Sequence, residues 1–170
     1  KFIIKNSTIN GSNEAANGGG IYINNSNVII DSTIIEGNKA NTGNSLVGMG
    51  GAIYVNNSDV TISNSHINEN VALLGGGNAG AAFYLKGNGP EKTVRIVDTQ
   101  IQGNSCNTGS AIYAENINVE LNRVLISGNS IHGNIGAPVY LINAPMSIRN
   151  CTITGNDCSG NNGAAGGISF

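Results

Sequence analysis

Few side chains in this 170-residue chain could carry out acid–base, metal or thiol chemistry. It has 10 acidic residues, 8 Lys and Arg, 2 His and 3 Cys. Glycoside hydrolysis needs two carboxyl groups about 5–10 Å apart, whereas the acidic residues here are scattered. His66 and His132 are single and lack the neighbouring ligands that a metal site needs. We therefore predict no enzyme activity, no catalytic residue, no metal ligand and no cofactor.

A frame of twelve positions recurs along the chain and determines which charged residues become neighbours. In Val60–Val71 (VTISNSHINENV), apolar residues occupy the first, third and eighth positions and an Asn the eleventh. The frame recurs without internal insertions, which indicates stacked coils of a solenoid in fixed register. The other copies start at Phe2, Val28, Val94, Val119 and Met146.

A second motif precedes each frame and consists of small residues followed by an apolar–Tyr–apolar triplet, as in GGGIYI (Gly18–Ile23). Its tyrosines are 32, 30, 29 and 27 residues apart. The chain also contains 25 Gly, no Trp and only 11% charged residues, which is typical of short strands joined by turns. We predict an all-β fold, with residues 1–170 forming a single parallel β-helix domain of three sheets and about five to six coils of 25–34 residues.

Stacking places like residues above one another, about 4.8 Å apart. A column of Ile is predicted to form the core, and a column of Asn is predicted to exchange side-chain amide hydrogen bonds. A column of Tyr is predicted to point outward as an aromatic ladder, with a sugar-stacking strip or a lateral filament contact as alternatives. The columns are Ile9, Ile35, Ile67, Ile101, Ile126 and Ile153; Asn38, Asn70, Asn104, Asn129 and Asn156; and Tyr22, Tyr54, Tyr84, Tyr113 and Tyr140.

The fifth position of the frame is predicted to be a corner with left-handed backbone, which Asn tolerates. Its occupants are Asn6, Ser32, Asn64, Asp98, Arg123 and Asn150, and Arg123 suits that role least. The same register puts Asp98 beside Arg123 and Arg95 beside Glu120. These are predicted to be surface ion pairs.

The three cysteines are not expected to form a disulfide. Cys151 falls in an inward column of small residues and is predicted to be a buried apolar side chain. Cys106 and Cys158 share a register two coils apart, with Ile131 between them. That separation, roughly 9.6 Å from the strand spacing, exceeds disulfide reach.

Five Asn-x-Ser/Thr sequons make glycosylation possible if the source glycosylates secreted proteins. Asn24 and Asn56 are expected at the same corner of adjacent coils. The sequon residues are Asn6, Asn10, Asn24, Asn56 and Asn150.

The alternation of a GG[AG]I-type motif, as in Gly50–Val55, with an apolar-x-x-Asn motif, as in Ile67–Asn70, resembles the polymorphic outer-membrane proteins of chlamydiae and related right-handed parallel β-helix proteins. In that family the second motif begins with Phe, whereas here it begins with Ile. The resemblance implies a right-handed helix, a surface-displayed adhesin and an extracellular or cell-surface location, and it supplies no catalytic residues.

Both ends of the sequence look like interrupted coils. Joining GGISF (166–170) to KFIIKN (1–6) resembles an internal coil, and neither end has the polar sequence of a capping repeat. Because Lys1 is not a translation start, we expect a mature or excised piece, one repeat unit of a longer array or filament.

The predicted function is therefore an extracellular structural solenoid whose partner is itself, head to tail. The first alternative is an adhesin fragment that binds a glycan or host surface ligand through loops Ala40–Met49, Leu73–Gly80 and Lys86–Lys92. A polysaccharide-active enzyme is the second alternative. A net charge of −2 argues against nucleic acid, and the short apolar runs argue against membrane insertion.

Overall fold

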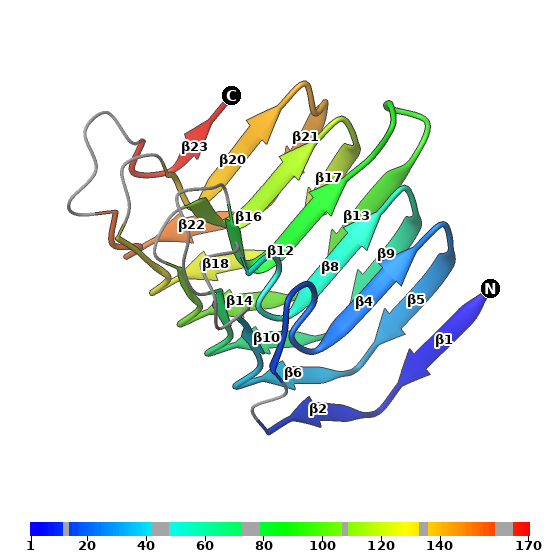
Figure 1. Ribbon diagram of the computed structural model, residues 1–170. Helices are drawn as coiled ribbons and strands as arrows, with labels where there is room; N and C mark the ends of the chain where they lie inside the picture. Colours follow the sequence, from blue (N-terminus) through cyan, green and yellow to red (C-terminus); the bar gives the residue numbers. More distant parts are fainter. Residues whose placement is uncertain (12–13, 42–47, 73–78, 107–108, 133–135, 159–164) are drawn as a thin grey trace.

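The computed structural model describes residues 1–11, 14–41, 48–72, 79–106, 109–132, 136–158 and 165–170. Over these residues the chain winds as a parallel β-solenoid, with the coils stacked one above another and the two termini at opposite ends of the stack (Figure 1). The prediction of an all-β solenoid is confirmed. Among the described residues no helix is long and apolar enough to cross a membrane.

The strands form four sheets, each of which receives at most one strand per coil. Sheet 1 contains β1 (Phe2–Lys5), β5 (Asn27–Asp31), β9 (Asp59–Ser63), β13 (Thr93–Val97), β17 (Asn118–Asn122) and β21 (Met146–Arg149). Sheet 2 contains β2 (Thr8–Asn10), β6 (Ile34–Glu36), β10 (His66–Asn68), β14 (Gln100–Gln102), β18 (Leu125–Ser127) and β22 (Thr152–Thr154). Sheet 3 contains β3 (Glu14–Ala15), β7 (Lys39–Ala40), β11 (Val71–Ala72), β15 (Ser105–Cys106) and β19 (Ser130–Ile131). Sheet 4 contains β4 (Ile21–Asn24), β8 (Ile53–Asn56), β12 (Ala79–Lys86), β16 (Gly109–Glu115), β20 (Val139–Ile142) and β23 (Ile168–Ser169).

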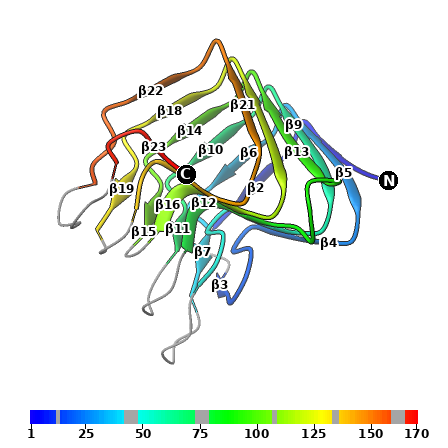
Figure 2. The same ribbon diagram turned by 90° about the horizontal axis from the view of Figure 1, so that it is seen from above.

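Sheets 1, 2 and 4 are the three predicted sheets and form the main sides of the solenoid (Figure 2). Sheet 3 is an additional short sheet of two-residue strands between sheets 2 and 4. Its strands follow directly after the Asn column, where the sequence frame ends. The Tyr-centred motif forms sheet 4, and the two halves of the frame form sheets 1 and 2.

The strand register follows the repeated frame. Ile35 pairs with Ile67, and Ile67 pairs with Ile101, so the predicted Ile column is continuous through sheet 2. These three residues are fully buried, whereas Ile9 and Ile153, in the outermost strands of sheet 2, are half-buried. Inward residues of sheets 1, 2 and 4 together make one hydrophobic core.

The corner between sheets 1 and 2 has left-handed backbone throughout. All six residues predicted for it have φ between 48° and 53°, and Arg123 is among them. A second left-handed corner lies between sheets 4 and 1. It consists of Asn25, Asn57, Asn116 and Asn143. Short polar side chains tolerate this conformation, which lets the chain turn sharply without glycine.

Candidate functional site

The Asn column forms the predicted ladder. Asn70 Nδ2 donates to Asn104 Oδ1 at 3.0 Å, and the same oxygen accepts the Asn70 backbone N–H at 3.0 Å. Asn70 Nδ2 also donates to the carbonyl oxygens of Ile35 and Asn68, each at 2.9 Å. The four inner Asn side chains are fully buried, and this arrangement satisfies the turn carbonyls around them. Such a network stabilises the stack and leaves nothing free for a ligand.

A second ladder, which the sequence reading did not identify, runs through the column of small residues. The Thr33 N–H donates to Ser65 Oγ at 3.1 Å, and the Ser65 N–H donates to Thr99 Oγ1 at 3.4 Å. At the C-terminal end of this ladder the acceptor is a sulfur atom, because the Val124 N–H donates to Cys151 Sγ at 3.4 Å. The prediction that Cys151 is a buried apolar residue is therefore only partly correct, because Cys151 packs against the core but also makes hydrogen bonds. Its thiol is half-buried and takes the place of a hydroxyl group.

The Tyr column stacks as predicted, with ring centroids 4.8–5.9 Å apart. The rings are not uniformly exposed, however, because Tyr22 is 55% exposed whereas Tyr84 and Tyr113 are 6% and 2% exposed. Burial raises the pKa of Tyr84 and of Tyr54 above the usual value. The buried middle rings cannot receive a sugar, so a sugar-stacking strip along the whole column is excluded.

None of the three cysteines, each within the described residues, forms a disulfide. Cys106 pairs in register with Ile131, and both belong with Cys158 to a small second core that also contains Ala40, Ala72 and Ala81. Burial raises the pKa of the Cys106 thiol to about 12. A thiol so buried and so weakly acidic is a packing residue rather than a nucleophile.

The sequon asparagines lie at corners and strand ends. Asn6, Asn10, Asn24 and Asn150 are exposed, and Asn56 is half-buried. Asn56 pairs in register with Asn24, and its Nδ2 donates to Asn24 Oδ1 at 2.7 Å. Because a glycan is attached through Nδ2, modification of Asn56 would break this contact. Glycosylation stays a prediction.

The predicted ion pairs form on the outer side of sheet 1 and its corner. Arg123 makes two bonds to Asp98, at 2.6 and 2.7 Å, and Arg95 Nε lies 2.8 Å from Glu120 Oε2. Hydrogen bonds from Arg123 lower the pKa of Asp98. Two further pairs, not predicted, are Lys5–Asp31 and Lys92–Asp59. The Lys5–Asp31 pair could have been found from the frame, because both residues occupy its fourth position.

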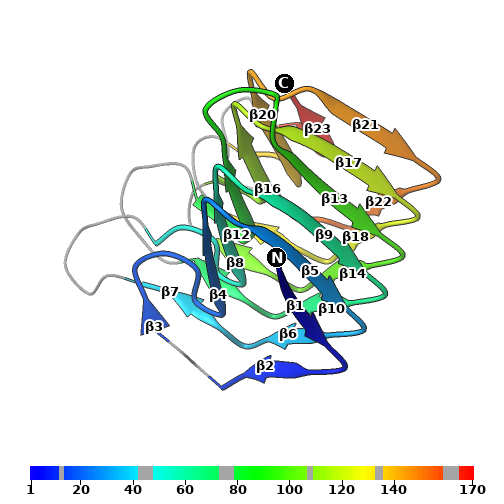
Figure 3. The ribbon, with the colours of Figure 1, turned by 90° about the vertical axis from the view of Figure 1, so that its right-hand side faces the viewer.

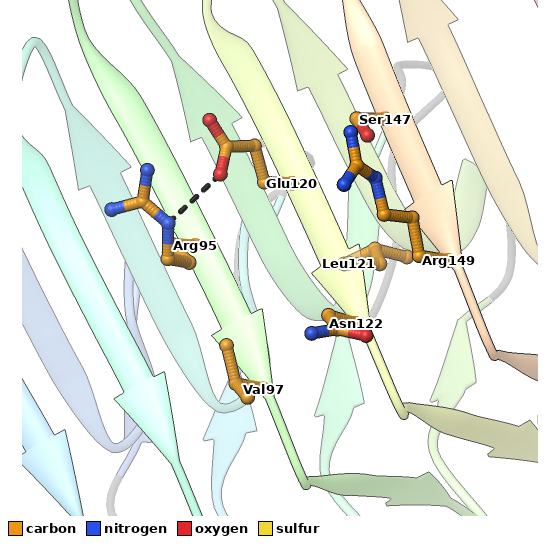
Figure 4. A pocket seen from close by; sticks show the side chains of 7 residues that line it. All are labelled: Arg95, Val97, Glu120, Leu121, Asn122, Ser147 and Arg149. Atoms are coloured by element: carbon orange, nitrogen blue, oxygen red, sulfur yellow. Dashed lines mark hydrogen bonds and ion pairs between the residues drawn. The ribbon is translucent and has the colours of Figure 1, made fainter.

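Beside the Arg95–Glu120 pair, the outer face of sheet 1 has a shallow depression of about 350 Å³. Arg95 reaches it from β13, Glu120 from β17, and Ser147 and Arg149 from β21 (Figure 4). Both arginines and the carboxylate face solvent here. The depression is formed by three successive coils, and each coil contributes part of the lining.

A second, apolar groove of about 520 Å³ lies at the N-terminal end of the stack. There β1 and β2 extend one coil beyond β4, the edge strand of sheet 4 (Figure 3). The groove is lined mainly by apolar side chains of β1, β4 and β5, and Phe2 and Tyr22 are 65% and 55% exposed. At the other end, β23 extends sheet 4 beyond the last coil.

Of the three loops predicted to carry recognition, only Lys86–Lys92 is fully described. It ends in the Lys92–Asp59 ion pair at 2.8 Å. Most of Ala40–Met49 and Leu73–Gly80 lies outside the described residues. His66 and His132 are both exposed. His132 Nε2 lies 2.8 Å from Ser130 Oγ.

Comparison with protein-family models, curated proteins and solved structures finds no match to this chain. The fold and its ladders define it as a parallel β-solenoid repeat protein.

Proposed function

We propose that this chain is an extracellular structural unit that stacks end to end with further copies of itself into a filament or stalk. The observation that carries the proposal is the complementarity of the two end coils. At the N-terminal end, the coil that contains β1 and β2 has no sheet 4 strand before β1. The apolar groove occupies the place of that strand, next to β4. At the C-terminal end, β23 supplies a sheet 4 strand with no sheet 1 strand after it.

The strand register supports a specific fit between the two ends. Ile168 pairs with Val139, which belongs to the same column as Ile21 of β4. A second copy's β23 placed beside β4 would set Ile168 over Ile21 and Phe170 over Ile23. Both pairs are apolar, so the core columns would continue from one unit into the next.

Burial of apolar surface would drive this contact. Phe2, which pairs with the buried Val28, and Phe170 are 65% and 99% exposed. Fully burying a large apolar side chain contributes about 1.5–3 kcal/mol. The backbone edges of the end strands would also gain parallel partners, as every inner strand has. A contact of this kind joins different surfaces and does not close on itself, so it builds a filament.

The units can be separate subunits or successive parts of one chain. In four of the coils, seven residue steps lead from the first apolar residue of sheet 4 to that of sheet 1, as from Ile21 to Val28. Direct fusion of Phe170 to Lys1 leaves only four steps from Ile168 to Phe2. A three-residue spacer such as Asn-Asn-Ser, the sequence of the corner Asn56–Ser58, would restore the spacing. The likeness of the repeat motifs to chlamydial surface proteins supports a location outside the cell.

Sedimentation velocity over a range of protein concentrations, with electron microscopy, tests the proposal. We expect the chain to form linear oligomers that Phe2→Asp and Ile168→Asp disrupt, because each puts a charge into the apolar contact. His66→Asp, which adds a charge on an exposed side face, is the matched control and should leave assembly unchanged. Two copies joined by the Asn-Asn-Ser spacer should unfold at a higher temperature than one.

Two results together would overturn the proposal. The single unit would stay monomeric at all concentrations, and the spacer-joined pair would unfold at the midpoint of the single unit. A monomeric unit with a stabilised joined pair would instead indicate stacking within one longer chain.

A further inference from the structure

The depression on the outer face of sheet 1 contains polar groups that the protein leaves without partners. Within the described residues, the Arg149 guanidinium has neither a hydrogen bond nor an ion pair, and Arg95 uses only Nε, toward Glu120 Oε2. The Ser147 hydroxyl also has no hydrogen-bond partner there. Asn122 accepts one long bond, 3.4 Å from Asn150 Nδ2, so its own amide N–H groups remain available.

The charges alternate across the three strands. Arg95, Glu120 and Ser147 pair in register across β13, β17 and β21. Arg149 lies two residues after Ser147, and its guanidinium reaches back beside Ser147, so the charged groups of Arg95, Glu120 and Arg149 form a row (Figure 4). Adjacent strands are about 4.8 Å apart, so the row carries a local net positive charge on a molecule whose net charge is −2. The neighbouring Arg123 is not part of this excess, because Asp98 already holds it with two bonds.

These groups fit a ligand that has both a carboxylate and hydroxyl groups. A free guanidinium forms two parallel hydrogen bonds with a carboxylate. Ser147 and Asn122 can donate to ring and hydroxyl oxygens, and Glu120 Oε1 can accept from a hydroxyl group. Val97, which also lines the depression, offers a small apolar surface to the C–H face of a sugar ring.

An extended acidic peptide fits less well. Peptides commonly bind a sheet by pairing with a free strand edge, but β13 and β17 are paired on both sides. A ligand over this face can meet side chains only. We propose that the outer face of β13, β17 and β21 binds an acidic saccharide, with the carboxylate of a uronic acid residue on Arg149 and its hydroxyl groups on Glu120, Ser147 and Asn122.

The site is built from one copy of the chain and does not depend on stacking. Calorimetric titration with tetragalacturonate at low ionic strength tests it, and neutral cellotetraose is the control ligand. We expect tetragalacturonate to bind, with affinity that falls as salt is added, and cellotetraose not to bind. Arg149→Gln should weaken binding at least about tenfold, since a charge-assisted bidentate contact is lost. Lys92→Gln removes the same charge outside the depression and should have no effect.

Further measurements separate a sugar from a plain anion. Glu120→Ala removes a repelling charge and a hydroxyl acceptor, so it should weaken tetragalacturonate binding but strengthen any binding of inorganic sulfate. Equal affinity for sulfate, tetraglutamate and tetragalacturonate would overturn the proposal, because the sugar would then contribute nothing. Unchanged binding in Arg149→Gln, or no binding of tetragalacturonate to the folded protein, would also overturn it.

Discussion

The Asn ladder should be the largest single polar contribution to stability, and Asn104 is the residue with which to test it. Its side chain is fully buried. Its Nδ2 donates to Ile67 O at 2.8 Å, Gln102 O at 3.1 Å and Asn129 Oδ1 at 3.0 Å. Its Oδ1 accepts both the backbone N–H and the Nδ2 of Asn70, each at 3.0 Å. Asn104→Ala therefore removes both amide N–H groups, which three oxygens share, and the oxygen that accepts two hydrogen bonds from Asn70.

The cost follows from the groups left behind. A buried polar group without a partner costs about 1–3 kcal/mol. Water that enters the vacated space can satisfy only some of the groups that lose their partner. At least two unsatisfied groups give a loss of about 3 kcal/mol or more, a large share of the roughly 5–15 kcal/mol that stabilises a typical domain. For a chain of this length the unfolding midpoint should fall by at least about 6–12 °C.

Urea and thermal unfolding followed by circular dichroism measure this loss. Asn118→Ala is the matched control, because Asn118 is half-buried and its side chain donates one bond, to Thr93 Oγ1 at 3.2 Å. It should cost no more than about 1 kcal/mol. If the two variants lost equal stability, the ladder would not contribute what its geometry implies.

Asn104→Asp adds a test by pH. The new carboxylate would be buried and would face the carbonyl oxygens of Ile67 and Gln102, so its folded-state pKa would lie above the unfolded value of about 3.9. A raised folded pKa means that the charged form opposes folding. Relative to wild type, the loss of stability in Asn104→Asp should be smallest near and below pH 4 and should grow as the pH rises toward 7. The loss of stability in Asn104→Ala, relative to wild type, should not change over that pH range.

Four further variants test backbone conformation and burial. Glu69 has φ of 54° at a frame position where all five other coils have Gly with positive φ. Glu69→Gly should therefore stabilise the fold by about 1 kcal/mol in urea unfolding, and an unchanged midpoint would show that no strain is present. A Cβ on Gly51 would lie 2.3 Å from the Ala81 carbonyl oxygen, so Gly51→Ala should cost at least about 1–3 kcal/mol, whereas Gly167→Ala, with open space, should be neutral. Burial raises the pKa of Tyr84, so wild-type stability should fall as the pH rises above about 10, and Tyr84→Phe should fall less in thermal scans at pH 8 and 11.

The sequence predicted those features that depend on one repeat placed upon the next. The Ile and Asn columns, the left-handed corner and the Asp98–Arg123 pair all follow from a frame without insertions. Sheet 3 was missed because its strands have only two residues. A signal for it is present, since the second residue of each strand from β7 to β19 is a buried small or apolar residue, as in Ala72 and Cys106.

Other features depend on distances that a repeat pattern does not contain. The small column was recognised, but its hydrogen bonds were not, because they require each hydroxyl to lie near the N–H of the coil before it. The burial of Tyr84 and Tyr113 could not be predicted either. An outward position in a strand does not specify what covers the side chain, and the rings at the two ends of the same column are more exposed. The depression beside Glu120 likewise depends on side-chain conformations in three coils.

The two proposals meet at the junction between units. Lys5, Asp31, Asn122 and Arg149 occupy one outward column of sheet 1. In a stack, Lys5 of the next copy would therefore lie one strand spacing, about 4.8 Å, from Arg149. Two cations at that distance oppose assembly, although Asp31 compensates in part because it lies 3.4 Å from Lys5.

An acidic saccharide on Arg149 would offset this repulsion. By linkage, a ligand that binds the assembled form more tightly also promotes assembly by the same factor. Tetragalacturonate should therefore lower the concentration at which linear oligomers form in sedimentation velocity, and cellotetraose should not. Lys5→Gln, which removes the repulsion, should assemble more readily without ligand and should respond less to it. Assembly that tetragalacturonate leaves unchanged in the wild type, although the ligand binds, would show that the saccharide site and the junction act independently.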